Sequence, residues 1–181
     1  MPEDWKLELQ SRGLEASEPM CASIGIDVRP AEVWKRIAAP GNLKRCHPFC
    51  ASTAVEKWPG VGSRDSITYY SGIRYQRDFV AWLDGVGYDM EVGSPTKKTC
   101  RVTWRIESRA PERSEFRITV FPYVEPGWSA REESRYLERF FGEAFEHYLQ
   151  CVVKGLKYHV TTGKDVREDQ FGANPVFSAP G

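Results

Sequence analysis

The spacing of apolar residues changes once along the chain, and this change restricts the possible folds more than any other feature. Between positions 51 and 123 apolar residues recur at every second position, in segments separated by turns that contain Pro or Gly. Between positions 129 and 160 they recur every three or four positions. Alternation at period two is typical of a half-buried strand, and the longer spacing is typical of an amphipathic helix. The sequence therefore predicts an α+β protein in which a sheet is followed by one long helix.

Seven strands are expected, and short turns such as Asp84-Gly85 join consecutive ones in an antiparallel sheet. The first strand is separated from the second by two short helices over 31–38 and 42–45, and Pro30 suits the first turn of the earlier helix. The predicted strands cover residues 20–28, 51–58, 65–70, 73–83, 88–92, 99–107 and 115–123.

The ends of the predicted long helix have recognisable signals. Ser129 and Glu132 stand at capping-box spacing, and Gly163 suits the end of the helix. We therefore expect one domain over residues 20–163. Residues 1–19 form an N-terminal arm, in which Trp5, Leu7 and Leu9 alternate as in a short strand, and residues 164–181 form a flexible C-terminal tail.

Composition excludes several classes of function. The chain has 25 Lys and Arg against 25 Asp and Glu, so its net charge does not suit nucleic-acid binding through bulk charge. No apolar run approaches the roughly 18 residues of a membrane span, and the first residues do not resemble a secretory signal, so a cytoplasmic protein is expected. The five cysteines are scattered and are predicted to be reduced. Cys46 and Cys50 flank His47 but lack a second pair at zinc-site spacing, so no metal and no cofactor are expected.

The order of these elements leads to a resemblance. Four stretches carry it: Val28-x-Pro30-x-x-Val33-Trp34, His47-Pro48-Phe49, the G-x-G-S turn over 60–63, and Gly155-Leu156-Lys157 followed by Gly163. Over residues 20–163 the chain resembles the START-like SRPBCC superfamily of polyketide cyclases, aromatase/cyclases and lipid-transfer domains. The resemblance implies a helix-grip fold, in which a curved sheet wraps around the long helix. It also implies an internal apolar pocket for a hydrophobic ligand, without implying one reaction.

Strand parity predicts which side chains face that pocket. The apolar face of each strand should turn toward the helix, because the other face of such a sheet meets water. For most of these side chains, simply filling a core is the alternative role. Several are aromatic with polar tips that need hydrogen-bond partners when buried. The candidate ligand-binding residues are Trp34, His47, Tyr69, Tyr75, Arg77, Phe79, Met90, Trp104, Ile118, Phe141, Phe145 and Tyr148.

Arg77 is the most informative candidate. It shares parity with Tyr75 and Phe79, so its charge should point inward, where it could bind a carboxylate, phosphate or enolate oxygen of a ligand. An internal salt bridge is one alternative, and a bulge that turns Asp78 inward is another. If Arg77 serves a ligand, Arg77→Met should leave thermal stability unchanged or raised while weakening binding of an acidic aromatic ligand.

The sequence predicts binding of a hydrophobic or aromatic small molecule in an internal cavity. Whether a cyclase- or dehydratase-type step accompanies binding stays open, and no catalytic residue is assigned. Arg77 with Tyr75 or His47 is the one acid–base set that the pattern offers. The alternative is a protein-interaction module of the same fold, similar to its co-chaperone branch, with a filled cavity. The identity of the ligand and the oligomeric state, monomer or dimer, are also open.

Overall fold

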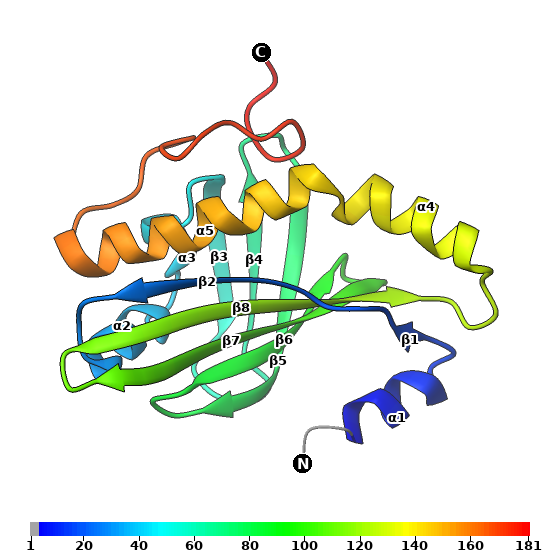
Figure 1. The fold of residues 1–181 in the computed structure, drawn as a ribbon, viewed down its shortest axis with the longest axis horizontal. Helices are drawn as coiled ribbons and strands as arrows, with labels where there is room; N and C mark the ends of the chain where they lie inside the picture. The colour runs from blue at the N-terminus through cyan, green and yellow to red at the C-terminus, as the bar shows by residue number, and fades with distance from the viewer. Residues whose placement is uncertain (1–3) are drawn as a thin grey trace.

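The segments of period two form one strongly curved antiparallel sheet in the computed structural model, which describes residues 4–181 (Figure 1). All seven predicted strands are present. The strands run in the order β3-β4-β5-β6-β7-β8, and β2 pairs with the free edge of β8. They are β2 (Met20–Ile26), β3 (Cys50–Lys57), β4 (Arg64–Tyr69), β5 (Arg74–Leu83), β6 (Gly87–Gly93), β7 (Lys98–Ala110) and β8 (Arg113–Val124).

Two short helices connect β2 to β3, as predicted. They are α2 (Pro30–Ile37) and α3 (Leu43–Cys46). Pro30 occupies the first turn of α2, where its missing N–H costs nothing, and the helix buries Val33 and Ile37 completely. The backbone of α3 lies directly against the long C-terminal helix at Gly155. A Cβ at Gly155 would come within 2.3 Å of the Cys46 carbonyl oxygen, so only glycine permits this contact.

The long helix is in fact two helices, α4 (Ala130–Phe141) and α5 (Glu143–Thr162), so the prediction of a single helix is wrong at this point. The capping box at its start is present, since Ser129 and Glu132 bond each other's backbone N–H. Gly142 interrupts the helix with extended backbone angles. The apolar stripe runs from Phe141 to Phe145 across the break, so periodicity alone does not reveal it. Helix α5 packs on the sheet and ends at Gly163, which adopts the left-handed conformation.

The N-terminal arm differs from the expected strand. Residues Asp4–Ser11 form helix α1, and only the two residues Glu15–Ala16 form a strand, β1, which pairs with β8. The ring of Trp5 packs edge-on against that of Phe121, with centroids 5.3 Å apart. Helix α1 lies on the side of the sheet away from α5 (Figure 1). Trp5 and Leu9 are four residues apart, so one side of a helix presents both, and the same spacing also fits a strand.

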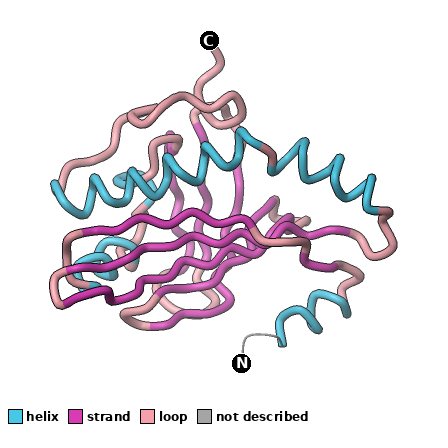
Figure 2. The backbone as a smooth tube through the Cα atoms, viewed as in Figure 1, coloured by secondary structure: helices cyan, strands magenta, loops and turns pink. Residues whose placement is uncertain are grey.

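The C-terminal residues pack on the domain, although the sequence predicts a loose tail. They lack regular secondary structure and follow α5 back along the surface (Figure 2). The backbone N–H of Val166 donates to the Arg45 carbonyl at 2.9 Å, and the Asn174 side chain donates to the Ala144 carbonyl at 2.6 Å. Phe177 is only 6% exposed. Within residues 4–181, no helix is long and apolar enough to cross a membrane.

Candidate ligand-binding cavity

A cavity of about 380 Å³ lies between the curved sheet and the helices α4 and α5. Side chains from five strands form its floor and sides, and two residues of the C-terminal tail close one part of it. The strand residues that line it are Ile67, Tyr69, Tyr75, Arg77, Met90, Val92, Thr99, Cys100, Val102, Trp104, Ile118 and Val120, together with Lys97 just before β7.

Most of the predicted site residues line this cavity. Parity along β4 to β8 holds as expected, because the register between β5 and β6 is regular as far as Phe79 and shifts only beyond it. Arg77 therefore points inward, and Asp78 points to the other face, where it pairs with Arg64 and Lys98. The predicted residues that line the cavity are His47, Tyr69, Tyr75, Arg77, Met90, Trp104, Ile118, Phe141, Phe145 and Tyr148.

Trp34 and Phe79 lie outside the cavity, so their assignment to it is wrong. Trp34 packs edge-on against Trp82 with ring centroids 5.5 Å apart. Phe79 is 1% exposed and packs edge-on against Trp58 and Tyr88. Trp34 on α2 also contacts Tyr88, so these rings pack together beside α2 and are not part of the cavity lining.

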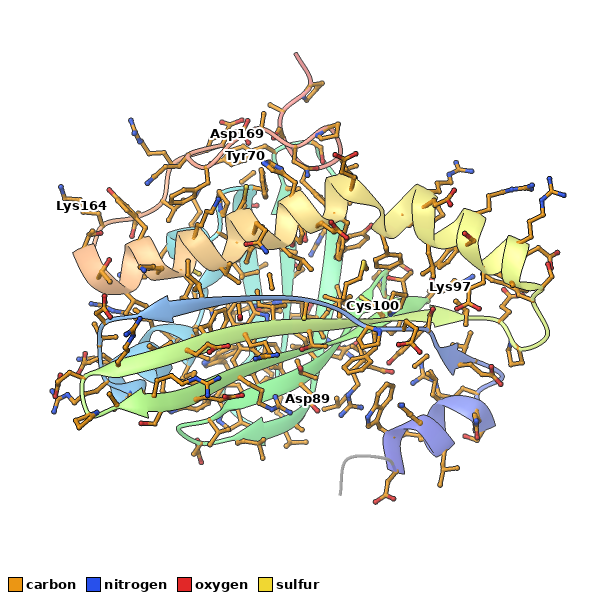
Figure 3. The ribbon with its side chains drawn as sticks, in the orientation of Figure 1. Tyr70, Asp89, Lys97, Cys100, Lys164 and Asp169 are labelled. Atoms are coloured by element: carbon orange, nitrogen blue, oxygen red, sulfur yellow. The ribbon has the colours of Figure 1, made fainter. Side chains whose placement is uncertain are left out.

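Several lining residues were not among the candidates. Cys100 shares the parity of Val102 and Trp104, which strand alternation already predicts to face inward, so the signal for it is present in the sequence. Val176 and Phe177 come from the tail, which has no periodicity to indicate that it packs. Further lining residues lie on α4 or in the turn before β7, namely Lys97, Tyr136, Arg139 and Phe140. Figure 3 shows Lys97 and Cys100 on the part of the sheet below α4.

Arg77 forms a buried ion pair with Asp65, which stands opposite it on β4. Its Nε donates to Asp65 Oδ1 at 2.7 Å, and its Nη2 donates to Asp65 Oδ2. The side chains are 4% and 0% exposed. The remaining nitrogen, Nη1, lies 3.8 Å from the sulfur of Met90. Of the three arrangements considered for Arg77, which were a ligand contact, an internal salt bridge and a bulge, the structure therefore contains the internal salt bridge. The charge of Arg77 is balanced within the protein.

The polar centre of the cavity is a row of three side chains, His47, Tyr148 and Tyr69. The His47 Nε2 and the Tyr148 hydroxyl oxygen are 3.0 Å apart, and so are the Tyr148 and Tyr69 hydroxyl oxygens. The backbone N–H of Phe49 donates to His47 Nδ1 at 3.2 Å. Burial, and after it the positive charge of Arg77, lowers the pKa of His47 to about 3. His47 is therefore neutral at physiological pH, and burial raises the pKa of both tyrosines, so they keep their protons.

The five cysteines, which all lie in the described part of the chain, are free thiols. Burial raises the pKa of Cys46 to about 12 and that of Cys50 to about 11. Within residues 4–181, no group of three or more His, Cys, Asp or Glu side chains is placed to hold a metal ion. Cys100 is the thiol that lines the cavity, and burial raises its pKa to about 12, so all three are unreactive thiols near neutral pH.

Comparison with known proteins bears on this geometry. The family model described as polyketide cyclase / dehydrase and lipid transport matches residues 20–161. The chain belongs to this family. The resemblance to the SRPBCC superfamily is thereby confirmed, and so is the fold that it implied. No curated protein sequence matches the chain.

Several solved structures share the fold of this chain at low sequence identity. A norcoclaurine synthase point mutant from Thalictrum flavum has a TM-score of 0.63 at 11% identity, covering 82% of this chain and 98% of that one. A protein of unknown function from Staphylococcus aureus has a TM-score of 0.61 at 12% identity, covering 81% and 96%. The Aha1 dimer from Colwellia psychrerythraea has a TM-score of 0.54 at 12% identity, covering 82% and 99%. These likenesses show the fold alone.

Proposed function

We propose that this protein binds an apolar or aromatic small molecule in the cavity between the sheet and the helices α4 and α5. The observation that carries the proposal is the open space itself. Protein interiors are packed nearly as densely as organic crystals, so a fold does not need a cavity of about 380 Å³ to be stable. Pockets that hold small molecules have volumes of roughly 300–1,000 Å³, are mainly apolar and carry a few polar groups.

The lining of the cavity has the chemistry that this proposal requires. Aliphatic and aromatic side chains make up most of the lining, and His47, Tyr148 and Tyr69 form a hydrogen-bonded polar row within it. The lining also contains polar side chains outside this row, among them Lys97, Thr99 and Arg139. The family description names lipid transport and cyclases, and the norcoclaurine synthase structure is described as a complex with a transition state analogue. Both descriptions concern proteins that accommodate organic molecules, which supports the same role for this cavity.

Two finer possibilities fit the geometry less well. An interaction module would have a filled interior, whereas this one is open. A cyclase-type step would draw on Arg77 with Tyr75 or His47, but the guanidinium of Arg77 is bonded to Asp65. His47 Nδ1 already accepts a hydrogen bond from Phe49, and its Nε2 faces Tyr148. The geometry therefore favours binding over acid–base catalysis.

A substitution that fills the cavity tests the proposal. Val152 lines it from α5, so Val152→Phe places the larger ring in open space. Val80→Phe is the matched control, because Val80 is 39% exposed on β5 and lies outside the lining. Titration with fluorene, followed by its fluorescence, should show at least about tenfold weaker binding to Val152→Phe and unchanged binding to Val80→Phe. Thermal unfolding should confirm that both variants are folded.

The proposal fails if wild-type protein does not bind fluorene, or if folded Val152→Phe binds it as tightly as Val80→Phe does. A second measurement is independent of the probe. Protein purified from its native host should release an apolar compound on solvent extraction, detected by mass spectrometry, and Val152→Phe expressed in the same host should release less of it.

A further inference from the structure

We propose that the row of His47, Tyr148 and Tyr69 gives the cavity one hydroxyl proton without a protein acceptor, and that this proton binds an acceptor oxygen of the ligand. The ligand class is then an apolar molecule that carries a ketone, quinone or ester oxygen. This inference rests on the proposed function, and it adds the chemical group that distinguishes one apolar ligand from another.

The position of one proton on His47 follows from its neighbours. Nδ1 accepts the backbone N–H of Phe49 at 3.2 Å, so Nδ1 carries no proton. A neutral imidazole has one proton, which must therefore sit on Nε2. That N–H donates to the hydroxyl oxygen of Tyr148 at 3.0 Å. Tyr148 is thus an acceptor toward His47, and its own proton is free to point elsewhere.

One of the three protons in this row, those of His47 Nε2 and the two tyrosine hydroxyls, has no acceptor within the row. The two tyrosine hydroxyls are 3.0 Å apart and share a single hydrogen bond, which uses one of their two protons. If Tyr148 donates to Tyr69, the proton of Tyr69 remains, and if Tyr69 donates to Tyr148, the proton of Tyr148 remains. Among the described residues, neither hydroxyl has another protein partner. Both side chains line the cavity, so the remaining donor is available to a molecule inside it.

The surroundings make this donor selective. The ring of Phe177 lies 4.4 Å from that of Tyr148 and 4.5 Å from that of Tyr69, and Phe145 stacks on Tyr148 at 5.2 Å. Tyr69 is 5% exposed. A hydroxyl proton left unpaired in such an apolar setting is unfavourable, so a ligand that supplies an oxygen gains affinity over one that does not.

The test compares two ligands that differ only at one carbon. Fluorene is a three-ring hydrocarbon, and 9-fluorenone replaces its methylene group by a ketone. Dissociation constants for both are measured with wild-type protein, Tyr69→Phe, Tyr148→Phe and the triple variant Tyr69→Phe/Tyr148→Phe/His47→Leu. The triple variant includes His47→Leu because the Nε2–H of His47, which also lines the cavity, would lose its acceptor once Tyr148 is replaced. The carbonyl stretching frequency of bound fluorenone is recorded by infrared spectroscopy as a direct measure of hydrogen bonding.

The proton count makes an unusual prediction for these variants. In Tyr69→Phe the proton of Tyr148 is free, and in Tyr148→Phe the proton of Tyr69 is free, so each single variant should keep the preference for the ketone. The triple variant keeps none of the three donors of this row, so its fluorenone-to-fluorene affinity ratio should fall about tenfold. Its bound carbonyl should also absorb at a higher frequency. Fluorene affinity should stay within about twofold across the variants, which shows that each is folded and retains the cavity.

The outcomes separate this inference from the proposed function. If wild-type protein binds neither compound, the proposed function fails. If it binds fluorene but the affinity ratio and carbonyl frequency are the same in wild-type protein and the triple variant, the assignment of the free hydroxyl is overturned. Loss of the whole preference in one single variant would equally contradict the shared proton.

Discussion

The ion pair between Arg77 and Asp65 changes what a substitution at Arg77 should do. Parity places Arg77 inward, as predicted, but Asp65 stands opposite it on β4 and neutralises it. Asp65 is fully buried, so removing the arginine would leave an isolated carboxylate in the interior. The expectation that Arg77→Met leaves stability unchanged does not hold for such a pair, because it assumed an arginine that serves only a ligand.

We expect Arg77→Met to lower the free energy of unfolding by about 3–5 kcal/mol, because breaking a buried pair leaves one charge uncompensated. The double variant Asp65→Leu/Arg77→Met should recover most of this loss, since apolar replacement of both partners is often neutral or better. Urea unfolding of the two single variants and the double variant measures this coupling. Full stability of Arg77→Met alone would show that the pair is not structural.

His47 should make the stability of the protein depend on pH. Its pKa is lowered from 6.5 to about 3, first by burial and then by the charge of Arg77. The unfolded chain therefore takes up this proton before the folded protein does, so the free energy of unfolding falls as pH drops below about 6.5. Between about pH 7.5 and about pH 5 the loss should be about 2 kcal/mol.

His47→Gln should remove this contribution, because glutamine does not titrate and can still donate toward Tyr148. Urea unfolding at both pH values should show that the variant loses about 2 kcal/mol less than wild-type protein over the same interval. An equal loss in the two proteins would mean that His47 is already protonated in the folded state, and the proton count in the cavity would then need revision.

At the scale of elements, the strands and the two short helices could be predicted because each has a regular pattern. Period two in β4 to β8 fixes both the strand and the face that each side chain occupies. The break at Gly142 could not be found from periodicity, because Phe141 and Phe145 keep the same stripe on both sides. The spacing of Trp5 and Leu9 fits a strand and a helix equally well. In these places local pattern gives two answers, and packing decides between them.

The candidate site, like the fold, could be predicted from the sequence only in part. Parity identifies the strand residues that line the cavity, but it does not show where the cavity ends. Phe79 has the correct parity and is nevertheless covered by Trp58 and Tyr88. Likewise, parity does not reveal that Asp65 stands opposite Arg77, because register between strands depends on the turn that joins them. Partner residues and cavity limits therefore required the structure.

At the scale of the whole molecule, the cavity depends on parts of the chain that are far apart in sequence. The sheet supplies most of the lining, α4 and α5 cover it, and the C-terminal tail completes it. Asn174 fixes the tail by donating to the Ala144 carbonyl and by accepting the N–H groups of Val176 and Phe177. Phe177 thereby reaches the rings of Tyr69 and Tyr148, so the tail forms part of the cavity wall.

This role of the tail predicts a difference between two phenylalanines of the cavity lining. Phe177 is 6% exposed and packs on Tyr69 and Tyr148, so Phe177→Ala should lower the free energy of unfolding by about 3 kcal/mol. Phe140 is 54% exposed on α4, and Phe140→Ala should cost less than about 1 kcal/mol. Urea unfolding measures both, and fluorene titration should show weaker binding to Phe177→Ala because one side of the cavity is lost. If the two variants have equal stability and equal fluorene affinity, the ring of Phe177 contributes nothing to packing. The tail would then not be part of the cavity wall.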